Sequence, residues 1–211
     1  MSLKKKLAAF AEEMSNNAPQ EVLETMGAEI SELVSKQQSR HALKAGDRAP
    51  NFSLQDSTGN IIELNEVLRR GPVFLSFNRG NWCPFCSLEF KALQESVNEV
   101  EKKSGTILVI SPQLPEKSQK LQQENGITYP ILFDEANKVA EQYGLVFTLP
   151  EVLRPIHEDF GMDIPAHNGD QSYRLPYPAT LAINTNGIIT YSFINANWMD
   201  RAEPSEVIAA L

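Results

Sequence analysis

Hydrophobic and polar residues follow two different periods along this chain. Residues 3–37 place hydrophobic side chains at helical spacing in two runs, which Asn16-Asn17-Ala18-Pro19 interrupts. From Gly46 onwards short apolar runs predict strands at 51–54, 61–64, 72–77, 106–110, 131–133, 179–183 and 188–193. Helical spacing between and after these runs predicts helices near 85–100, 115–125, 135–143 and from Glu203-Pro204 towards Leu211.

The order of these elements predicts the fold class. A strand, a helix and a second strand between residues 72 and 110 imply a right-handed βαβ unit with parallel strands. Asn186-Gly187 indicates a tight hairpin between the last two strands. We therefore predict an α/β domain over residues 44–211, with a central mixed sheet flanked by helices, and an N-terminal helical extension over residues 1–43.

Two segments leave their roles open. The helical extension could dock on its own domain or pair with a second subunit in a homodimer, and docking is the preferred interpretation. The segment 144–177 contains four prolines and is predicted to form a short helix around Glu151 to His157, followed by an irregular loop. Long loops in compact domains often carry function.

Charge and composition exclude several classes of partner. Nineteen basic residues against 27 acidic ones give a net charge of −8, which argues against affinity for nucleic acid or anionic membranes. The chain has no apolar run long enough to span a bilayer, no signal-peptide core and only two cysteines. These features predict a soluble protein of the reducing cytoplasm.

Both cysteines lie where a predicted strand gives way to a predicted helix. Cys83 and Cys86 flank Pro84 and Phe85, and Pro84 suits the first helical turn. The unpaired N–H groups and the dipole at a helix start stabilise a thiolate, and Arg79 should add a positive charge nearby. Cysteines at i and i+3 share one helical face, so they can close a small disulfide.

Two other interpretations of the cysteine pair are weaker. A structural zinc site usually needs four Cys or His ligands, and the three histidines are not spaced as a zinc-binding pair. An inert, buried pair is possible because free cysteine packs as a small hydrophobic residue. Trp-Cys-Pro-x-Cys between a strand and a helix is instead a strong redox signal, so we predict no metal and no cofactor.

The Cys-x-x-Cys motif on the first long helix, with Tyr177-Pro178-Ala179-Thr180 before a late strand, resembles the thioredoxin fold. More closely, the chain is similar to the peroxiredoxin-like branch of the alkyl hydroperoxide reductase/thiol-specific antioxidant family. The matching pieces are residues 45–54, Trp82 to Cys86 with Glu89, Pro178 to Leu181, and Asn186-Gly187.

The resemblance implies residue roles, although the chain departs from the family pattern. The family places Thr or Ser three residues before its peroxide-reactive cysteine, which makes Cys86 the reactive sulfur and Cys83 its resolving partner. Pro178 stands where the family has a distant arginine just before the late strand. A proline there resembles the cis-proline of thioredoxins, which lies against the active disulfide.

Supporting roles follow from the same motif. Arg79 is the nearest candidate to stabilise the thiolate and the leaving oxyanion, and Arg174 is a weaker candidate with a surface role preferred. Glu89 is expected to orient Arg79 or the helix. Trp82 and Phe85 are expected to shape an apolar rim.

The resemblance implies a thiol peroxidase that reduces a hydroperoxide and is recycled by a thioredoxin-type donor. The alternative is a protein thiol-disulfide oxidoreductase, which the Cys-x-x-Cys motif, Trp82 and Pro178 favour, and in which Cys83 would attack. A third possibility is a redox-sensing or scaffolding partner without turnover, to which the helical extension points.

Overall fold

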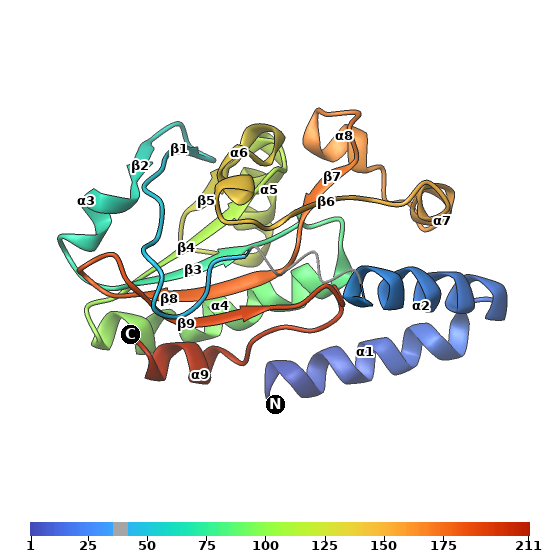
Figure 1. Cartoon of the computed structure of the whole chain (residues 1–211), viewed down its shortest axis with the longest axis horizontal. Coiled ribbons are helices and arrows are strands. Elements are labelled where there is room, and N and C mark those ends of the chain that lie inside the picture. The colour runs from blue at the N-terminus through green and yellow to red at the C-terminus, as the bar shows by residue number, and fades with distance from the viewer. Residues whose placement is uncertain (36–41) are drawn as a thin grey trace.

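The computed structural model describes residues 1–35 and 42–211 (Figure 1). Its helices are α1 (Leu3–Asn17), α2 (Gln20–Ser35), α3 (Leu64–Leu68), α4 (Pro84–Lys102), α5 (Pro115–Asn125), the 3-10 turn η2 (Glu135–Asn137), α6 (Lys138–Gln142), α7 (Leu153–Asp159), α8 (Ile164–Asn168) and α9 (Pro204–Ala209). Its strands are β1 (Ser53–Asp56), β2 (Ile61–Glu63), β3 (Val73–Phe77), β4 (Thr106–Ser111), β5 (Ile131–Phe133), β6 (Val146–Thr148), β7 (Arg174–Pro176), β8 (Ala179–Ile183) and β9 (Ile189–Ile194).

Seven of these strands form one mixed sheet in the order β2-β1-β5-β4-β3-β8-β9. Strands β3, β4 and β5 run parallel, whereas β8 pairs antiparallel with both β3 and β9. The β3–α4–β4 unit is the predicted βαβ unit, and the predicted hairpin joins β8 to β9. The α/β fold class, with a central mixed sheet between helices, is confirmed.

Alternation along the central strands divides the core into two halves. Phe74 of β3 and Val109 of β4 pack with the residues of α4 and α9, whereas Leu75 and Leu108 pack with the residues of α3 and α6. Side chains on neighbouring strand positions point to opposite faces of a sheet. Ser76, two residues after Phe74, therefore lies on the same face of the sheet as Phe74. This polar residue faces α4, the helix that carries the cysteines.

The two N-terminal helices pack on the same chain. Leu3 and Leu7 of α1 and Met26 and Leu33 of α2 are buried in the half of the core that contains α4. The Leu3 amide donates to the Glu203 carboxylate at 3.0 Å, which ties α1 to the start of α9. These contacts agree with docking of the extension on its own chain. The boundary at residue 43 stays a prediction, because residues 36–41 lie outside the described part of the chain.

The segment 144–177 differs from its prediction. The short helix exists as α7, but the predicted irregular loop contains a second helix, α8, and strand β7, which pairs with β6 in a two-stranded sheet. Phe147 and Tyr177 stack at its base with ring centroids 4.7 Å apart. Asp163 caps α8 by accepting from the Ala166 amide at 2.9 Å. Neither β6 nor β7 is a continuous apolar run, and β7 ends in a proline, so the pattern did not reveal them although the equally short β2 and β5 were predicted.

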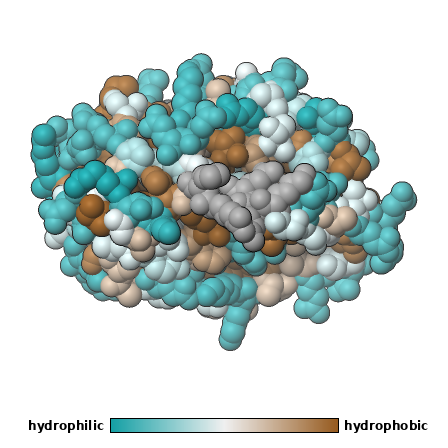
Figure 2. Space-filling view, in the orientation of Figure 1, coloured by the Kyte–Doolittle hydropathy of each residue, from teal (hydrophilic) through white to brown (hydrophobic). Residues whose placement is uncertain are grey.

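Hydrophilic residues cover most of the face seen in Figure 2, with hydrophobic residues scattered between them. Five large hydrophobic side chains of the described residues are exposed, namely Met1, Val34, Ile61, Val152 and Phe160. Scattered apolar residues of this kind are ordinary on a protein surface. Within residues 1–35 and 42–211, no helix combines the length and the hydrophobicity needed to cross a membrane.

Candidate functional site

A tight loop between β3 and α4 positions the two cysteines. The loop turns at Gly80, whose φ of +127° is unfavourable for other residues, and a Cβ atom there would lie 2.8 Å from the Gln113 side chain. Cys83 is the last residue before α4 and Cys86 lies in its first turn. Both thiols are free and buried, with 1% and 0% of their surface exposed. Pro84 occupies the first helical position, as predicted.

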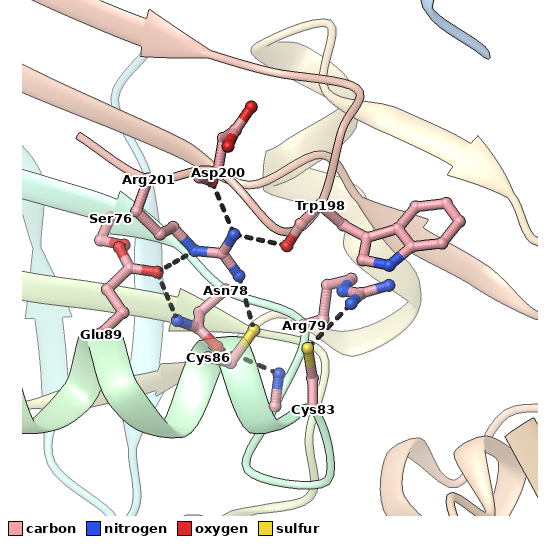
Figure 3. A network of polar contacts seen from close by, with 10 residues as sticks. Ser76, Asn78, Arg79, Cys83, Cys86, Glu89, Trp198, Asp200 and Arg201 are labelled. Atoms are coloured by element: carbon pink, nitrogen blue, oxygen red, sulfur yellow. Dashed lines mark hydrogen bonds and ion pairs between the residues drawn. The ribbon is translucent and has the colours of Figure 1, made fainter. Parts of the chain in front are cut away.

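Arg79 is the immediate neighbour of Cys83 (Figure 3). Its Nη2 donates to Cys83 Sγ at 2.8 Å, and the side chain is 2% exposed. The guanidinium lies 5.2 Å from the ring centroids of both Trp82 and Trp198, so two aromatic faces hold the charge in place. The structure therefore places Arg79 and Trp82 beside the dithiol.

A second guanidinium, which sequence reasoning missed, contacts the other sulfur (Figure 3). Arg201 follows β9 and is fully buried, and its Nη2 donates to Cys86 Sγ at 3.1 Å. Its Nη1 donates to the carbonyl oxygens of Trp198 at 2.6 Å and Asp200 at 2.7 Å. These backbone acceptors fix the fork of the guanidinium, so each cysteine has an arginine of its own.

Glu89 has a different partner from the predicted one. One of its oxygens accepts from Arg201 Nε at 2.5 Å and from Asn78 Nδ2 at 3.2 Å, and the other accepts from Ser76 Oγ at 2.8 Å. Thr180 lies opposite Ser76 in the β3–β8 register and is also buried. Burial raises the pKa of the Glu89 carboxyl, but the charge of Arg201 and the hydrogen bonds from Ser76 and Arg201 oppose the rise, and the form that accepts from all three donors is the carboxylate paired with Arg201. Glu89 thus contacts Arg201 rather than Arg79, and its bonds to Ser76 and Asn78 also tie α4 to the end of β3, which agrees with the other expected role of orienting the helix.

The two thiols have opposite acidities. Burial by itself would raise the pKa of Cys83, but the hydrogen bond from the Cys86 thiol and the charges of Arg79 and Arg201 outweigh it and hold that pKa well below its usual value. Burial and the hydrogen bond to the Cys83 sulfur raise the pKa of Cys86 well above its usual value. The pair therefore carries one negative charge, and it resides on Cys83.

A pocket of about 220 Å³ opens over Cys83. Its apolar lining comes from α1, α2, the start of α4 and the segments that follow α7 and β9. These residues are Phe10, Met14, Met26, Trp82, Pro84, Phe85, Phe160, Met162 and Trp198. Three buried N–H groups in or beside it, namely Arg79 Nε, Arg79 Nη1 and Trp82 Nε1, have no hydrogen-bond partner in the structure. A ligand with an apolar body and one or two oxygen acceptors would match this lining.

His157 of α7 is a further pocket residue that the sequence did not identify. Its Nδ1 lies 2.8 Å from the carbonyl oxygen of Leu153, so this nitrogen carries the proton and Nε2 carries the lone pair. Its ring meets the edge of Trp82 at 6.1 Å between centroids. Burial and the charge of Arg79 lower its pKa, which keeps the imidazole neutral near pH 7. His157 thus lines the pocket as a neutral imidazole.

Pro178 and Arg174 are the two remaining residues for which the sequence suggested a role near the dithiol. The peptide bond before Pro178 is trans, as are the others in residues 1–35 and 42–211, so the resemblance to a cis-proline is wrong. The chain runs extended through Tyr177 into β8, and the Tyr177 amide donates to Leu145 at 2.6 Å. Arg174 pairs with Glu141 on the surface at 2.6 Å, in agreement with the preferred surface role.

Comparisons with known proteins agree with this geometry. The model of the AhpC/TSA family matches residues 45–192. Thiol-disulfide oxidoreductase ResA of Halalkalibacterium halodurans is 29% identical over 137 residues, which are 64% of this chain and 75% of that protein. Peroxiredoxin Bcp of Escherichia coli is 32% identical over 103 residues, which are 49% of this chain and 65% of that protein.

A solved structure supports the fold. The crystal structure of peroxidoxin BcpB from Mycobacterium tuberculosis superposes with a TM-score of 0.64 at 24% identity, and the match covers 80% of this chain and 96% of that one. The family match begins after the two N-terminal helices and includes the helix that carries the cysteines. The chain therefore belongs to the AhpC/TSA family and is an oxidoreductase of thioredoxin-like fold.

Proposed function

We propose that the protein is a thiol peroxidase that reduces hydroperoxides through a dithiol–disulfide cycle of Cys83 and Cys86. The observation that carries the proposal is the Cys83 sulfur, which lines an apolar pocket and accepts from Arg79 at 2.8 Å. Arg79 Nε and Nη1 and Trp82 Nε1 are buried without a partner near this sulfur, and we propose that a peroxide bound at Cys83 engages the arginine as a donor. The pocket has room for an organic group on the far oxygen.

The proposed reaction uses one oxygen of the peroxide. The Cys83 thiolate attacks it, the O–O bond breaks, and the remaining oxygen leaves with the bond's electron pair and takes a proton as alcohol or water. Cys83 is then a sulfenic acid. The Cys86 sulfur attacks Cys83, hydroxide leaves and takes the Cys86 proton as water, and a disulfide forms.

The geometry favours Cys83 as the attacking sulfur, in contrast to the family pattern, which points to Cys86. Cys83 lines the pocket and has the lowered pKa, while Cys86 lies behind it and keeps its proton. A thiolate is the nucleophile, and access decides which sulfur meets the substrate. Cys86 is then the resolving residue.

A dithiol donor of the thioredoxin type would regenerate the enzyme. Its thiolate attacks Cys83, which is the sulfur nearer the pocket, and a second attack releases the donor as a disulfide. We place this cycle in the reducing cytoplasm, where such donors keep thiols reduced. A homodimer stays a prediction, and the packing of α1 and α2 on their own chain does not require one.

A second candidate function is protein thiol-disulfide exchange. The similarity to ResA, which covers 64% of this chain, favours it, and so does the low pKa of the first cysteine of the motif. The same pocket would then hold an apolar side chain beside a disulfide of another protein.

One experiment separates the functions. Reduced protein is mixed with hydrogen peroxide or cumene hydroperoxide, and sulfenic acid is trapped with dimedone in Cys83→Ser and Cys86→Ser. Trapping on Cys83 in the Cys86→Ser variant, and none in Cys83→Ser, is the expected result. The reverse pattern would make Cys86 the nucleophile. Without trapping in either variant, turnover of insulin disulfides would favour the exchange function, and no turnover would leave a redox sensor.

A further inference from the structure

The charges buried around the two sulfurs balance only while the dithiol is reduced. Two guanidinium groups, Arg79 and Arg201, face one carboxylate, Glu89, and one thiolate, Cys83 (Figure 3). All four side chains are at most 2% exposed. Formation of the Cys83–Cys86 disulfide removes the thiolate and leaves one positive charge without a partner. An unpaired buried charge is costly, so the structure disfavours the disulfide relative to the dithiol.

Arg201 is the guanidinium that contacts both Cys86 and Glu89. Its Nη2 lies 3.1 Å from Cys86 Sγ, and its Nε is held by Glu89. We infer that Arg201 stabilises Cys86 as the leaving thiolate when a donor opens the disulfide, and that its positive charge, which is unbalanced once the Cys83 thiolate is lost, makes the Cys83–Cys86 couple easily reduced. This role rests on the proposed dithiol–disulfide cycle.

The step can be written with its electrons and protons. A donor thiolate bonds to Cys83 Sγ, the Cys83–Cys86 bond breaks, and Cys86 Sγ leaves with the electron pair of that bond. A leaving thiol departs faster when its anion is stabilised. Arg201 provides that stabilisation through a fixed N–H donor aimed at the sulfur. The second donor thiol then attacks the mixed disulfide, Cys83 leaves as the thiolate beside Arg79, and Cys86 takes up a proton.

Glu89 should act in the opposite sense to Arg201. Its carboxylate shares the guanidinium with Cys86 and lowers the positive field at that sulfur. Removal of the carboxylate therefore leaves Arg201 more strongly directed to Cys86, whereas removal of Arg201 leaves Cys86 without a cation. The two residues touch each other, yet their loss shifts the redox equilibrium in opposite directions. A merely structural pair would not give opposite signs.

The test is the equilibrium of the full chain with reduced and oxidised glutathione, followed by alkylation and mass spectrometry. Relative to the unsubstituted protein, Arg201→Met should shift the equilibrium at least tenfold towards the disulfide, which corresponds to about 30 mV. Arg201→Lys should recover part of that shift. Glu89→Gln should shift the equilibrium towards the dithiol. Arg174→Met, which removes a surface arginine, should leave it unchanged.

The double variant Arg201→Met/Glu89→Gln removes both buried charges together and keeps the test available if Arg201→Met does not fold. Because the double variant loses Arg201 as well as the carboxylate, it should shift the equilibrium at least threefold towards the disulfide relative to Glu89→Gln. An Arg201→Met protein within twofold of the unsubstituted one, or shifts of the same sign in Arg201→Met and Glu89→Gln, would overturn the inference. Failure of the unsubstituted protein to form any Cys83–Cys86 disulfide would instead refute the proposed cycle.

Discussion

At the level of single residues, the two cysteines differ in their charged neighbours and in their access to the pocket, because both are almost fully buried. Arg79 contacts Cys83, which lines the pocket, and Arg201 contacts Cys86, which lies behind it. The hydrogen bond between the two sulfurs confines the negative charge to Cys83. A few contacts of about 3 Å thus determine which of the two sulfurs is the reactive thiolate.

Replacing Arg79 tests the first of these contacts. Arg79→Met keeps much of the side-chain volume but removes the donor at 2.8 Å and the nearest positive charge, so the pKa of Cys83 should rise towards that of an ordinary thiol. Titration of the thiolate by ultraviolet absorbance would show the rise. The rate of peroxide reduction at pH 7 should fall at least tenfold, because both the thiolate fraction and a donor to the peroxide are lost.

The control for this variant is Arg174→Met, since Arg174 forms a surface ion pair away from the dithiol. Its pKa curve and its rate should match those of the unsubstituted protein. If Arg79→Met keeps its rate at neutral pH and at a pH where every thiol is ionised, Arg79 has no part in the reaction.

Local sequence revealed only part of this site. The residues within one loop and one turn, Arg79, Trp82, Cys83 and Cys86, follow from a motif whose spacing fixes their geometry. Arg201 and His157 could not be found in this way. Arg201 follows β9 and His157 lies on α7, both far from the cysteines in sequence, so no periodic pattern links them to the motif. Glu89 was recognised as structural but given the wrong arginine for the same reason.

At the level of elements, strands marked by an apolar run were predictable even at three residues, whereas β6 and β7, which lack such a run, were not. The runs at β3 and β4 are buried on both faces, so their hydrophobicity marks them clearly. Strands β6 and β7 have three residues each and owe their pairing to tertiary contacts such as the Phe147–Tyr177 stack. The N-terminal helices were predicted from periodicity, but their contribution to the pocket was not.

The N-terminal helices form one wall of the pocket and should influence which hydroperoxide reacts. Met14→Trp on α1 adds volume to the pocket lining, so it should exclude a bulky organic group more than hydrogen peroxide. We expect the ratio of the rates with cumene hydroperoxide and hydrogen peroxide to fall about tenfold, the effect of losing one to two kcal/mol of apolar contact. Stopped-flow rates on the reduced protein measure this ratio.

Glu13→Trp adds the same side chain to the exposed face of the same helix and should leave the ratio unchanged. Equal ratios in Met14→Trp and in the unsubstituted protein would mean that the substrate approaches Cys83 without entering this pocket.

At the level of the whole molecule, the acidity of Cys83 couples the redox state to stability. Its pKa is lower in the folded protein than in the unfolded chain, where it is about 8.5. The thiolate therefore contributes stability that is complete above about pH 8.5 and is lost as the pH falls through the folded-state pKa. The oxidised protein has no ionisable thiol and lacks this contribution.

The free energy of unfolding of the reduced protein, minus that of the oxidised protein, should therefore rise with pH up to about pH 8.5. Its slope approaches about 1.4 kcal/mol per pH unit where Cys83 is a thiolate when folded and a thiol when unfolded. Urea unfolding of both forms between pH 5 and about pH 8.5 measures the slope. Reduced Cys83→Ser should lack it, and a flat or falling difference would show that Cys83 is not ionised in the folded state.

The distance along the chain between Cys86 and Arg201 has a consequence for biosynthesis. These residues are 115 positions apart, and Trp198, whose ring packs against the Arg79 guanidinium, belongs to the same late segment as Arg201. A nascent chain that has made β3 and α4 but not this segment has Arg79 but lacks Arg201 and Trp198, so its thiols should be closer to ordinary ones, which are only a few per cent ionised at pH 7. We therefore expect the cysteines to gain their full reactivity only when the segment after β9 brings Arg201 and Trp198 to the site.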